Sequence, residues 1–250
     1  MEKLPSLMVF KTRVCLGTFD DILAIIRETM ATGQRICIDT SNTVVVSLAA
    51  INGKFRKALE TYDILLSDSM PLVWYLRLLG SRIKTTCYAP EATLRIWDRF
   101  SGNSKIMVIG SDDKTKALFE SKFNKPAAWV TSRIDPDDPE AVSRLIRQIN
   151  RVDPDILFLA LGCPKSYYLL QKIKTQIKRG AIIHVGGSFD IISGRKRITP
   201  AKFQKLGLGW LFRLTQEPRR LIKRYMIFNT LFILCVFRYF KKNKRQAADS

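Results

Sequence analysis

The order of apolar and polar positions divides the chain near Gly194. Before this point, short apolar runs bounded by Gly, Pro or charged residues alternate with longer stretches in which apolar residues recur every three or four positions. Such runs are typical of buried strands, and the longer stretches of amphipathic helices. The predicted strands cover residues 35–39, 64–66, 82–87, 105–110, 127–131, 155–162 and 181–185. The predicted helices cover residues 21–32, 44–59 with a bend at Gly53, 72–79, 90–100, 112–123, 139–152 and 164–180.

Alternating strands and helices, with strands that are almost continuously apolar, indicate a mostly parallel sheet that is covered on both faces. The predicted class is therefore α/β, a Rossmann-like sheet with helices on both faces. We expect residues 1–194 to form this α/β domain and residues 195–250 to form a basic helical appendage.

The second part of the chain has a distinct charge pattern. Fifteen basic residues and one acid, Glu217, lie between Arg195 and Arg245, a net charge of +14. Aromatic and aliphatic residues such as Trp210 are interleaved with them, as in helices that lie in a membrane interface. The apolar run 225–237 is shorter than the ~20 residues of a spanning helix, so it suits lying in or dipping into the interface. The alternative is a solvated basic helical tail.

Composition narrows the possible partners. The 250 residues include 42 Lys and Arg against 22 Asp and Glu, a net charge of +20, which favours an anionic partner. The five cysteines are scattered without a CxxC pair, as expected of free thiols in a reducing compartment. Residues 1–13 lack the apolar run of a signal peptide.

Asp68 follows the apolar run 64–66, where a buried strand is expected to end. Ligands of open α/β sheets bind beyond the carboxyl ends of the strands. Asp68 is therefore a candidate catalytic base or ligand anchor. The alternative is that it caps the next helix, because Asp is a preferred N-cap residue.

A second candidate region follows the last predicted strand. Gly186 and Gly187 would let the backbone approach a ligand closely, and Asp190 follows them. The alternative is a simple tight turn. Neither the GxGxxG dinucleotide fingerprint nor the GxxxxGK[ST] phosphate loop occurs in the chain.

Other catalytic chemistries find little support. His184 is the only histidine, which we take to exclude Ser-His-Asp and multi-His metal chemistry, and we predict that it is structural. The two D-x-D patterns, at 135–137 and 153–155, are more typical of turns than of a divalent-metal site. No cofactor or metal is expected.

Three C-terminal motifs carry a family resemblance. Residues 185–194 (VGGSFDIISG), 204–214 (QKLGLGWLFRL) and 217–225 (EPRRLIKRY) resemble the C-terminal signature of the WecG/TagA/CpsF bacterial glycosyltransferases. Upstream matches, collinear from about residue 14 to 232, are Thr40-Ser41-Asn42, Asp68-Ser69-Met70 and Leu161-Gly162-Cys163-Pro164-Lys165.

The resemblance implies a reaction. Members of this family transfer a sugar, often of the N-acetylmannosamine type, from a UDP-sugar to a polyprenyl-diphosphate-linked saccharide, with inversion and without a metal. They act at the cytoplasmic face of the bacterial cell membrane in teichoic acid, enterobacterial common antigen or exopolysaccharide biosynthesis. The implied partners are thus the two substrates, an anionic membrane surface and further copies of the chain in a homo-oligomer.

The resemblance also implies residue roles. Asp68 would be the general base, Thr40 and Asn42 would line the pocket, and Lys165 and Asp190 would help to hold the nucleotide sugar near Gly186 and Gly187. The cations that would complete the site and meet the lipid diphosphate are Arg213, Arg219, Arg220 and Arg224. Fixed cations suit a diphosphate, in agreement with the charge pattern.

The chain departs from the family pattern in four places, of which two are single residues, Ser69 in place of Gly and Gly209 in place of Glu. The loop that the family writes R-V-x-G-x-D-L has Thr86, Ala89 and Glu91 in place of Arg, Gly and Asp, and Ser166-Tyr167 replaces Gln-Glu. These changes imply either a different donor sugar or weakened activity. One rival function is accordingly a catalytically impaired relative that binds lipid-linked saccharide or a partner enzyme. Nucleic-acid binding is disfavoured, because the charge is concentrated in an apolar, aromatic tail.

Overall fold

A six-stranded, all-parallel sheet forms the centre of the molecule, in the order β4-β3-β8-β7-β5-β6. A computed structural model describes residues 4–131 and 134–248, with side chains as far as Tyr239. The strands of this sheet are β3 (Arg35–Ser41), β4 (Ile64–Ser67), β5 (Ile106–Gly110), β6 (Ala128–Val130), β7 (Ile156–Ala160) and β8 (Gly180–His184). The predicted α/β class with a parallel sheet is confirmed.

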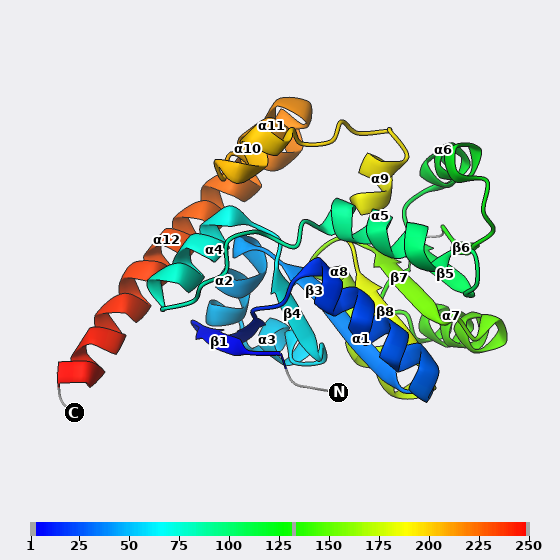
Figure 1. The fold of residues 1–250 in the computed structure, drawn as a ribbon, viewed down its shortest axis with the longest axis horizontal. Coiled ribbons are helices and arrows are strands. Elements are labelled where there is room, and N and C mark those ends of the chain that lie inside the picture. Colours follow the sequence, from blue (N-terminus) through cyan, green and yellow to red (C-terminus); the bar gives the residue numbers. More distant parts are fainter. Residues whose placement is uncertain (1–3, 132–133, 249–250) are drawn as a thin grey trace.

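Helices cover both faces of this sheet (Figure 1). Those of the first part are α1 (Phe19–Thr32), α2 (Thr43–Ile51), α3 (Gly53–Leu59), α4 (Met70–Leu78), α5 (Ala89–Phe100), α6 (Asp113–Phe123), α7 (Pro139–Val152), α8 (Lys165–Ile173) with the 3-10 turn η1 (Lys174–Gln176), and α9 (Ser188–Ile192). The remaining helices are α10 (Ala201–Lys205), α11 (Gly209–Gln216) and α12 (Pro218–Ala248).

The buried core has two halves because successive strand side chains point to opposite faces. Ile36 and Ile38 of β3 pack with α1, α5 and α6 on one face, around Trp97. Cys37 between them packs with α3, α7 and α8 on the other face, around Tyr167. Both faces are therefore buried, which explains why the strands are almost entirely apolar.

Four local predictions differ from the structure. Residues 82–87 form no strand, because only the Cys87 N–H reaches the sheet, donating to the Ser67 carbonyl over 2.7 Å. Helix α1 begins at Phe19, two residues before its predicted start, and Thr18 caps it, since its hydroxyl and the Asp21 carboxylate form a capping box. Helix α8 ends at Ile173, whereas its predicted end was residue 180. A hairpin of β1 (Ser6–Val9) and β2 (Thr12–Cys15) was not predicted.

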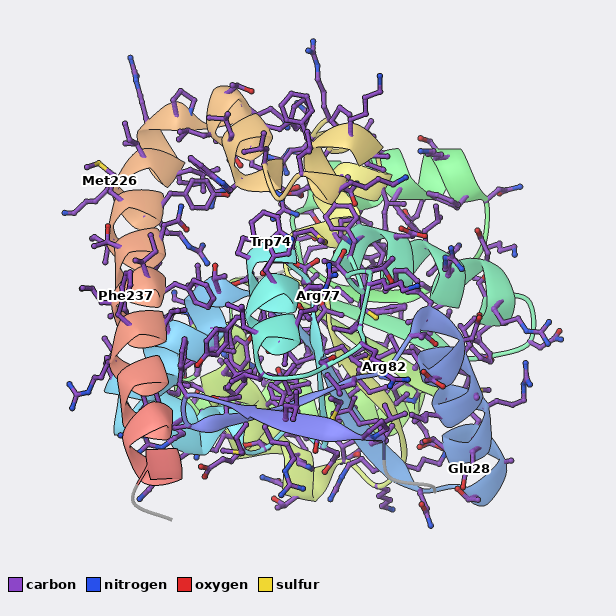
Figure 2. All side chains as sticks on the ribbon, turned by 60° about the vertical axis from the view of Figure 1, so that its left-hand side comes forward. Glu28, Trp74, Arg77, Arg82, Met226 and Phe237 are labelled. Carbon is purple, nitrogen blue, oxygen red and sulfur yellow. The ribbon has the colours of Figure 1, made fainter. Side chains whose placement is uncertain are left out.

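The long helix α12 runs back along α2 and α4 (Figures 1 and 2). Its Phe232 ring lies 5.7 Å from that of Phe10 in the hairpin and 6.3 Å from that of Tyr75 in α4. Leu221 and Cys235 are buried on the same side. One side of the apolar run 225–237 thus packs on protein. The division of the chain at Gly194 stays a prediction.

Within the two described ranges, none of the helices meets the length and apolarity that crossing a bilayer requires. Exposed apolar side chains of α12 nevertheless form a stripe at Ile222, Met226, Ile233 and Phe237. Figure 2 shows Met226 and Phe237 on the outer side of the helix. The helix therefore has one apolar side buried in the protein and another exposed.

Phe232→Ala is expected to lower the free energy of unfolding by about 3–5 kcal/mol, because it removes a buried ring and leaves a cavity. Chemical denaturation followed by circular dichroism would measure the change. Leu234→Ala is the matched control on the same helix, and since Leu234 is 60% exposed, a change within about 0.5 kcal/mol is expected. Equal effects of the two substitutions would contradict the packing of α12.

Candidate active site

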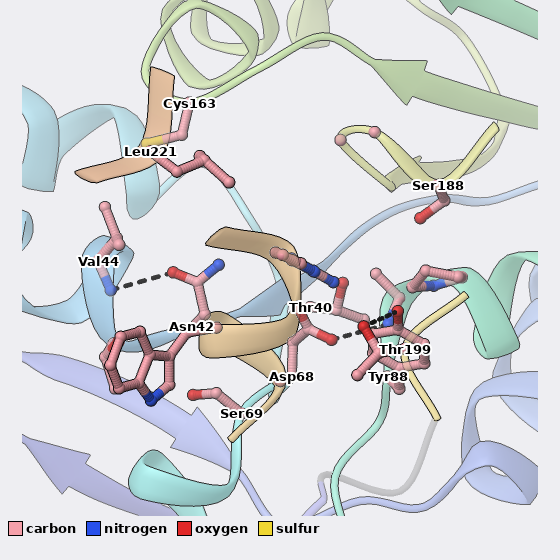
Figure 3. Close-up of a pocket in the computed structure, with 18 of the residues that line it drawn as sticks. Thr40, Asn42, Val44, Asp68, Ser69, Tyr88, Cys163, Ser188, Thr199 and Leu221 are labelled. Carbon is pink, nitrogen blue, oxygen red and sulfur yellow. Dashed lines mark hydrogen bonds between the residues drawn. The ribbon is translucent and has the colours of Figure 1, made fainter. Parts of the chain in front are cut away.

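A cavity of about 610 Å³ lies at the carboxyl ends of the strands, between the sheet and helices α11 and α12 (Figure 3). Nine of the eleven residues predicted for the site line its wall, in agreement with the expected place of ligands in open α/β sheets. They are Thr40, Asn42, Asp68, Gly186, Gly187, Asp190, Arg213, Arg220 and Arg224.

Lys165 and Arg219 are the two predicted residues that the structure does not bring to the cavity wall. Lys165 is exposed at the first position of α8. Arg219 is exposed on α12, where successive residues point about 100° apart, so that only its neighbour Arg220 lines the cavity. The sequence motif alone could not separate these two arginines.

Asp68 directly follows β4 and is held by two backbone contacts. Its N–H donates to the Ser41 carbonyl over 2.7 Å, and its Oδ1 accepts a 2.8 Å hydrogen bond from the N–H of Ala89, the first residue of α5. Oδ2 accepts no hydrogen bond from the described residues. The alternative that Asp68 caps the next helix is wrong, because Ser69 is the N-cap residue of α4.

The surroundings of Asp68 favour its protonated form. Burial raises its pKa to about 7, and the nearby Asp39 carboxylate acts in the same direction. Arg213, the Ala89 N–H and His184 act to lower it, but they do not offset burial. A carboxylate of this kind can exchange a proton near neutral pH, as a general base requires.

Arg213 lies close to this carboxylate. Its guanidinium group lies 5.6 Å from the centre of the Tyr88 ring, and the Tyr88 hydroxyl is 3.5 Å from the Thr199 hydroxyl. These contacts join α11 to the segment that precedes α5. Tyr88 and Thr199 both line the cavity, although neither was predicted as a site residue.

Asn42 has a structural task as well as a place in the wall. Its side-chain oxygen accepts hydrogen bonds from the N–H groups of Val44, at 3.0 Å, and Val45, at 3.4 Å, and so caps α2. No described residue accepts a hydrogen bond from its amide nitrogen. A ligand can therefore meet a fixed donor here, beside Thr40 at the end of β3.

Asp190 is already engaged by neighbouring side chains. Its Oδ1 accepts a 2.8 Å hydrogen bond from the Thr115 hydroxyl, and Lys196 Nζ lies 2.8 Å from its Oδ2. Lys196 is also 3.5 Å from Glu217, which accepts two hydrogen bonds from Arg220. These ion pairs hold the side chains at the rim of the cavity in place. The basic tract 195–197 was the signal for Lys196, which the predicted site omitted.

His184 lies in a buried polar network beneath the cavity. Its Nδ1 is 2.6 Å from the Asp39 carboxylate, which also accepts a 3.0 Å hydrogen bond from Tyr167, and its Nε2 is 2.9 Å from the Ser166 hydroxyl. One histidine is thus sufficient to build a Ser-His-Asp arrangement, so the number of histidines alone did not exclude one. The Ser166 side chain is nevertheless fully buried and lies outside the cavity wall, so it cannot attack a bound ligand.

The two D-x-D patterns take part in ion pairs. Asp137 lies 3.0 Å from Lys172, while Asp153 and Asp155 lie 2.9 and 2.6 Å from Arg179. In the part of the chain that the structure describes, no group of three His, Cys, Asp or Glu residues is arranged to hold a metal ion. Basic side chains therefore neutralise carboxylates of both patterns.

The departures from the family pattern fall at different places around the cavity. Ala89 replaces a glycine but contributes its backbone N–H to Asp68, which any non-proline residue can supply. Glu91 pairs with Arg95 over 2.7 Å outside the wall, whereas Thr86 lines it. Ser166 and Tyr167 belong to the His184 network. The contact of Asp68 is thus retained despite the altered loop.

Two comparisons with known proteins bear on the family of the chain. A curated protein of Bacillus spizizenii, named N-acetylglucosaminyldiphosphoundecaprenol N-acetyl-beta-D-mannosaminyltransferase, is 23% identical over 195 residues, covering 73% of this chain and 72% of its own length. The family model described as "Glycosyl transferase WecG/TagA/CpsF family" matches residues 7–246, and so spans the sheet, Asp68 and the arginines of α11 and α12. The chain that builds this cavity belongs to the WecG/TagA/CpsF family of glycosyl transferases.

Proposed function

We propose that the chain is an inverting, metal-independent hexosyltransferase that moves a sugar from a UDP-sugar to a polyprenyl-diphosphate-linked saccharide, in the biosynthesis of a cell-surface polysaccharide. The observation that carries this proposal is the placement of Asp68 in the wall of a cavity that arginines also line, with one carboxylate oxygen held by Ala89 and the other without a hydrogen bond from the described residues. The name of the Bacillus relative supports a donor of the N-acetylmannosamine type and an acceptor of the diphosphoundecaprenol type.

The proposed reaction is a single displacement. The acceptor hydroxyl oxygen forms a bond to the anomeric carbon of the donor sugar while the bond from that carbon to the UDP oxygen breaks. Asp68 takes the hydroxyl proton, and UDP leaves with the bonding electrons. Arg213, Arg220 and Arg224 offer positive charge to the diphosphate groups. One displacement inverts the anomeric centre, so that one carboxylate is sufficient.

The two substrates are assigned to opposite parts of the cavity. Thr40, Asn42, Gly186 and Gly187 form the part above the strand ends, which we assign to the nucleotide sugar. Asp190 lies at its rim. Helix α12 forms the other part, which we assign to the acceptor, and we assign Arg213 of α11, which acts on Asp68, to the leaving diphosphate. Lys165 and Arg219 take no direct part in this assignment, because neither lines the wall.

We further propose that the protein acts as a peripheral protein at the cytoplasmic face of the bacterial cell membrane. The exposed apolar stripe of α12 and the basic residues around it suit an anionic lipid surface. The same proposal includes the association of copies of this chain with one another on the membrane. A lipid-linked acceptor is anchored in the membrane, so the protein has to bind it at such a surface.

The test is release of UDP by the purified full-length chain, supplied with a polyprenyl-diphosphate saccharide and a panel of UDP-sugars. Release with one donor is expected, with inverted configuration of the product by NMR and an unchanged rate in EDTA. No release with any donor, combined with retained binding of the lipid-linked saccharide, would favour the catalytically impaired alternative. Retention of configuration would exclude the single displacement.

The rate should depend on pH through Asp68. The base acts in its ionised form, so with a pKa of about 7 kcat/KM should fall about tenfold per pH unit below 6 and level off above 8. A pH-rate profile from 5 to 9 measures this limb. A rate that stays constant down to pH 5 would contradict the assignment of the base.

A further inference from the structure

Part of the cavity wall is apolar and is not used by the proposed chemistry; we call this part the apolar branch. It extends between α12 and the first turns of α2 and α4. Val44, Val45, Met70 and Pro71 line it on one side, and Leu221 and Phe232 of α12 line it on the other. By contrast, the part above the strand ends is lined by Thr40, Asn42, Asp68 and the glycines. The two parts of one cavity therefore suit chemically different groups.

Helix α12 shows the same change of polarity along its length. Its cavity-lining residues are cationic at Arg220 and Arg224, polar at Asn229, and apolar at Phe232 and Ile233. With a rise of about 1.5 Å per residue, Arg224 and Ile233 lie about 14 Å apart along the helix axis. Arg224 has no carboxylate partner among the described residues. The wall thus presents free positive charge at one end and aliphatic and aromatic surface at the other.

At the apolar end, Ile233 both lines the cavity and is 53% exposed. Ile233 also belongs to the exposed stripe with Ile222, Met226 and Phe237. Their spacings of four and seven residues place all four on one side of the helix. The apolar branch therefore adjoins, at Ile233, the surface on which apolar side chains are exposed.

We propose that this branch binds the first isoprenoid units of the acceptor lipid. The ligand it fits is an amphiphile with an anionic head and an aliphatic chain, and a polyprenyl diphosphate is such a molecule. Its diphosphate lies beside Arg224, its saccharide extends to Asp68, and its chain runs along Phe232 and leaves past Ile233. This inference rests on the proposed function, and it assigns to the lipid chain a specific site in the protein.

The proposal gives the lipid chain a role in acceptor affinity. Burial of aliphatic units against Phe232 and Ile233 stabilises the bound acceptor, whereas the groups around Asp68 that carry the reaction are the same for any chain length. A long-chain acceptor should accordingly have a lower KM than an acceptor with the same saccharide diphosphate and a methyl group. The kcat values of the two acceptors should be similar.

The test compares Ile233→Glu with Leu234→Glu in detergent micelles without a bilayer. Both residues are exposed on α12, at 53% and 60%, but only Ile233 lines the cavity. Both acceptors are assayed with each variant. Ile233→Glu should raise the ratio of KM for the polyprenyl acceptor to KM for the methyl acceptor at least tenfold. The matched control Leu234→Glu should change this ratio less than twofold. The uncharged Ile233→Gln should act in the same direction as Ile233→Glu.

The possible outcomes decide between the inference and its rivals. Equal changes of the ratio in the two glutamate variants would mean that the lipid meets only the surface of α12, and would overturn the inference. An unchanged ratio in both Ile233 variants would overturn it too. If the wild type shows no turnover with either acceptor, the proposed function fails. The lipid site is then tested separately, by measuring the binding of polyprenyl diphosphate without a saccharide by calorimetry. Affinity at least tenfold weaker in Ile233→Glu alone would then support the branch, and equal affinities would overturn it.

Discussion

Asp68→Asn is expected to lower kcat by about 10²–10⁴-fold, the usual contribution of a general base. The amide cannot take the proton of the acceptor hydroxyl at any pH near neutrality. Its oxygen can still accept the hydrogen bond from the Ala89 N–H, which holds Oδ1 at 2.8 Å in the wild type. Steady-state release of UDP under saturating substrates measures the loss. Asp98→Asn on the exposed side of α5 is the control and should retain full activity.

The same substitution should leave the fold intact or strengthen it. Between its ordinary pKa of 3.8 and its folded pKa of about 7, Asp68 binds more protons in the folded than in the unfolded chain. The free energy of unfolding therefore falls as pH rises through this interval. The asparagine variant lacks this loss, so at pH 8 it should be at least as stable as the wild type. An active Asp68→Asn, or one that unfolds at pH 8, would contradict the assignment.

Arg213→Met is expected to lower kcat by about 10²–10³-fold, as the loss of one group that stabilises developing charge usually does. Arg213 also acts to lower the pKa of Asp68. Without it that pKa should rise further, and the acid limb of the pH-rate profile should move to higher pH. Arg213→Lys, which keeps the charge, should move the limb less. Kinetics from pH 5 to 9 would show both effects.

Arg219→Met is the matched control for Arg213→Met, because both arginines belong to the C-terminal motif but only Arg213 lines the cavity. We expect it to change kcat less than twofold. Equal losses in the two methionine variants would show that the motif acts through its overall charge. A normal pH profile in Arg213→Met would contradict the coupling between Arg213 and Asp68.

The sequence predicted most of the sheet because its strands are buried on both faces and are therefore continuous apolar runs. Residues 156–160 form one such strand, β7. The segment 82–87 was predicted wrongly. Alternating polar and apolar residues are typical of a strand, but the pattern does not show whether a partner strand is near. The hairpin of β1 and β2 escaped prediction because its short strands are partly exposed and mix polar with apolar residues, unlike the continuous apolar runs of the central sheet.

The sequence also located most of the candidate site. Strand ends and a family motif pointed to nine residues that the structure places on one cavity wall. The same reasoning included Lys165 and Arg219 and left out Tyr88 and Lys196. A motif records which residues occur together along the chain, but the direction of each side chain depends on helix phase and on neighbours distant in sequence.

By itself, the sequence determined the α/β class, the strand-end position of Asp68 and the concentration of positive charge after Gly194. These features depend on local periodicity and composition, which folding preserves. Only the tertiary structure decided that the Ala89 N–H binds Asp68, that Asp39 and Ser166 meet His184, and that α12 forms both a packed side and a cavity wall. Each of these contacts joins residues far apart in the chain, and their geometry is set by the packing of whole helices on the sheet.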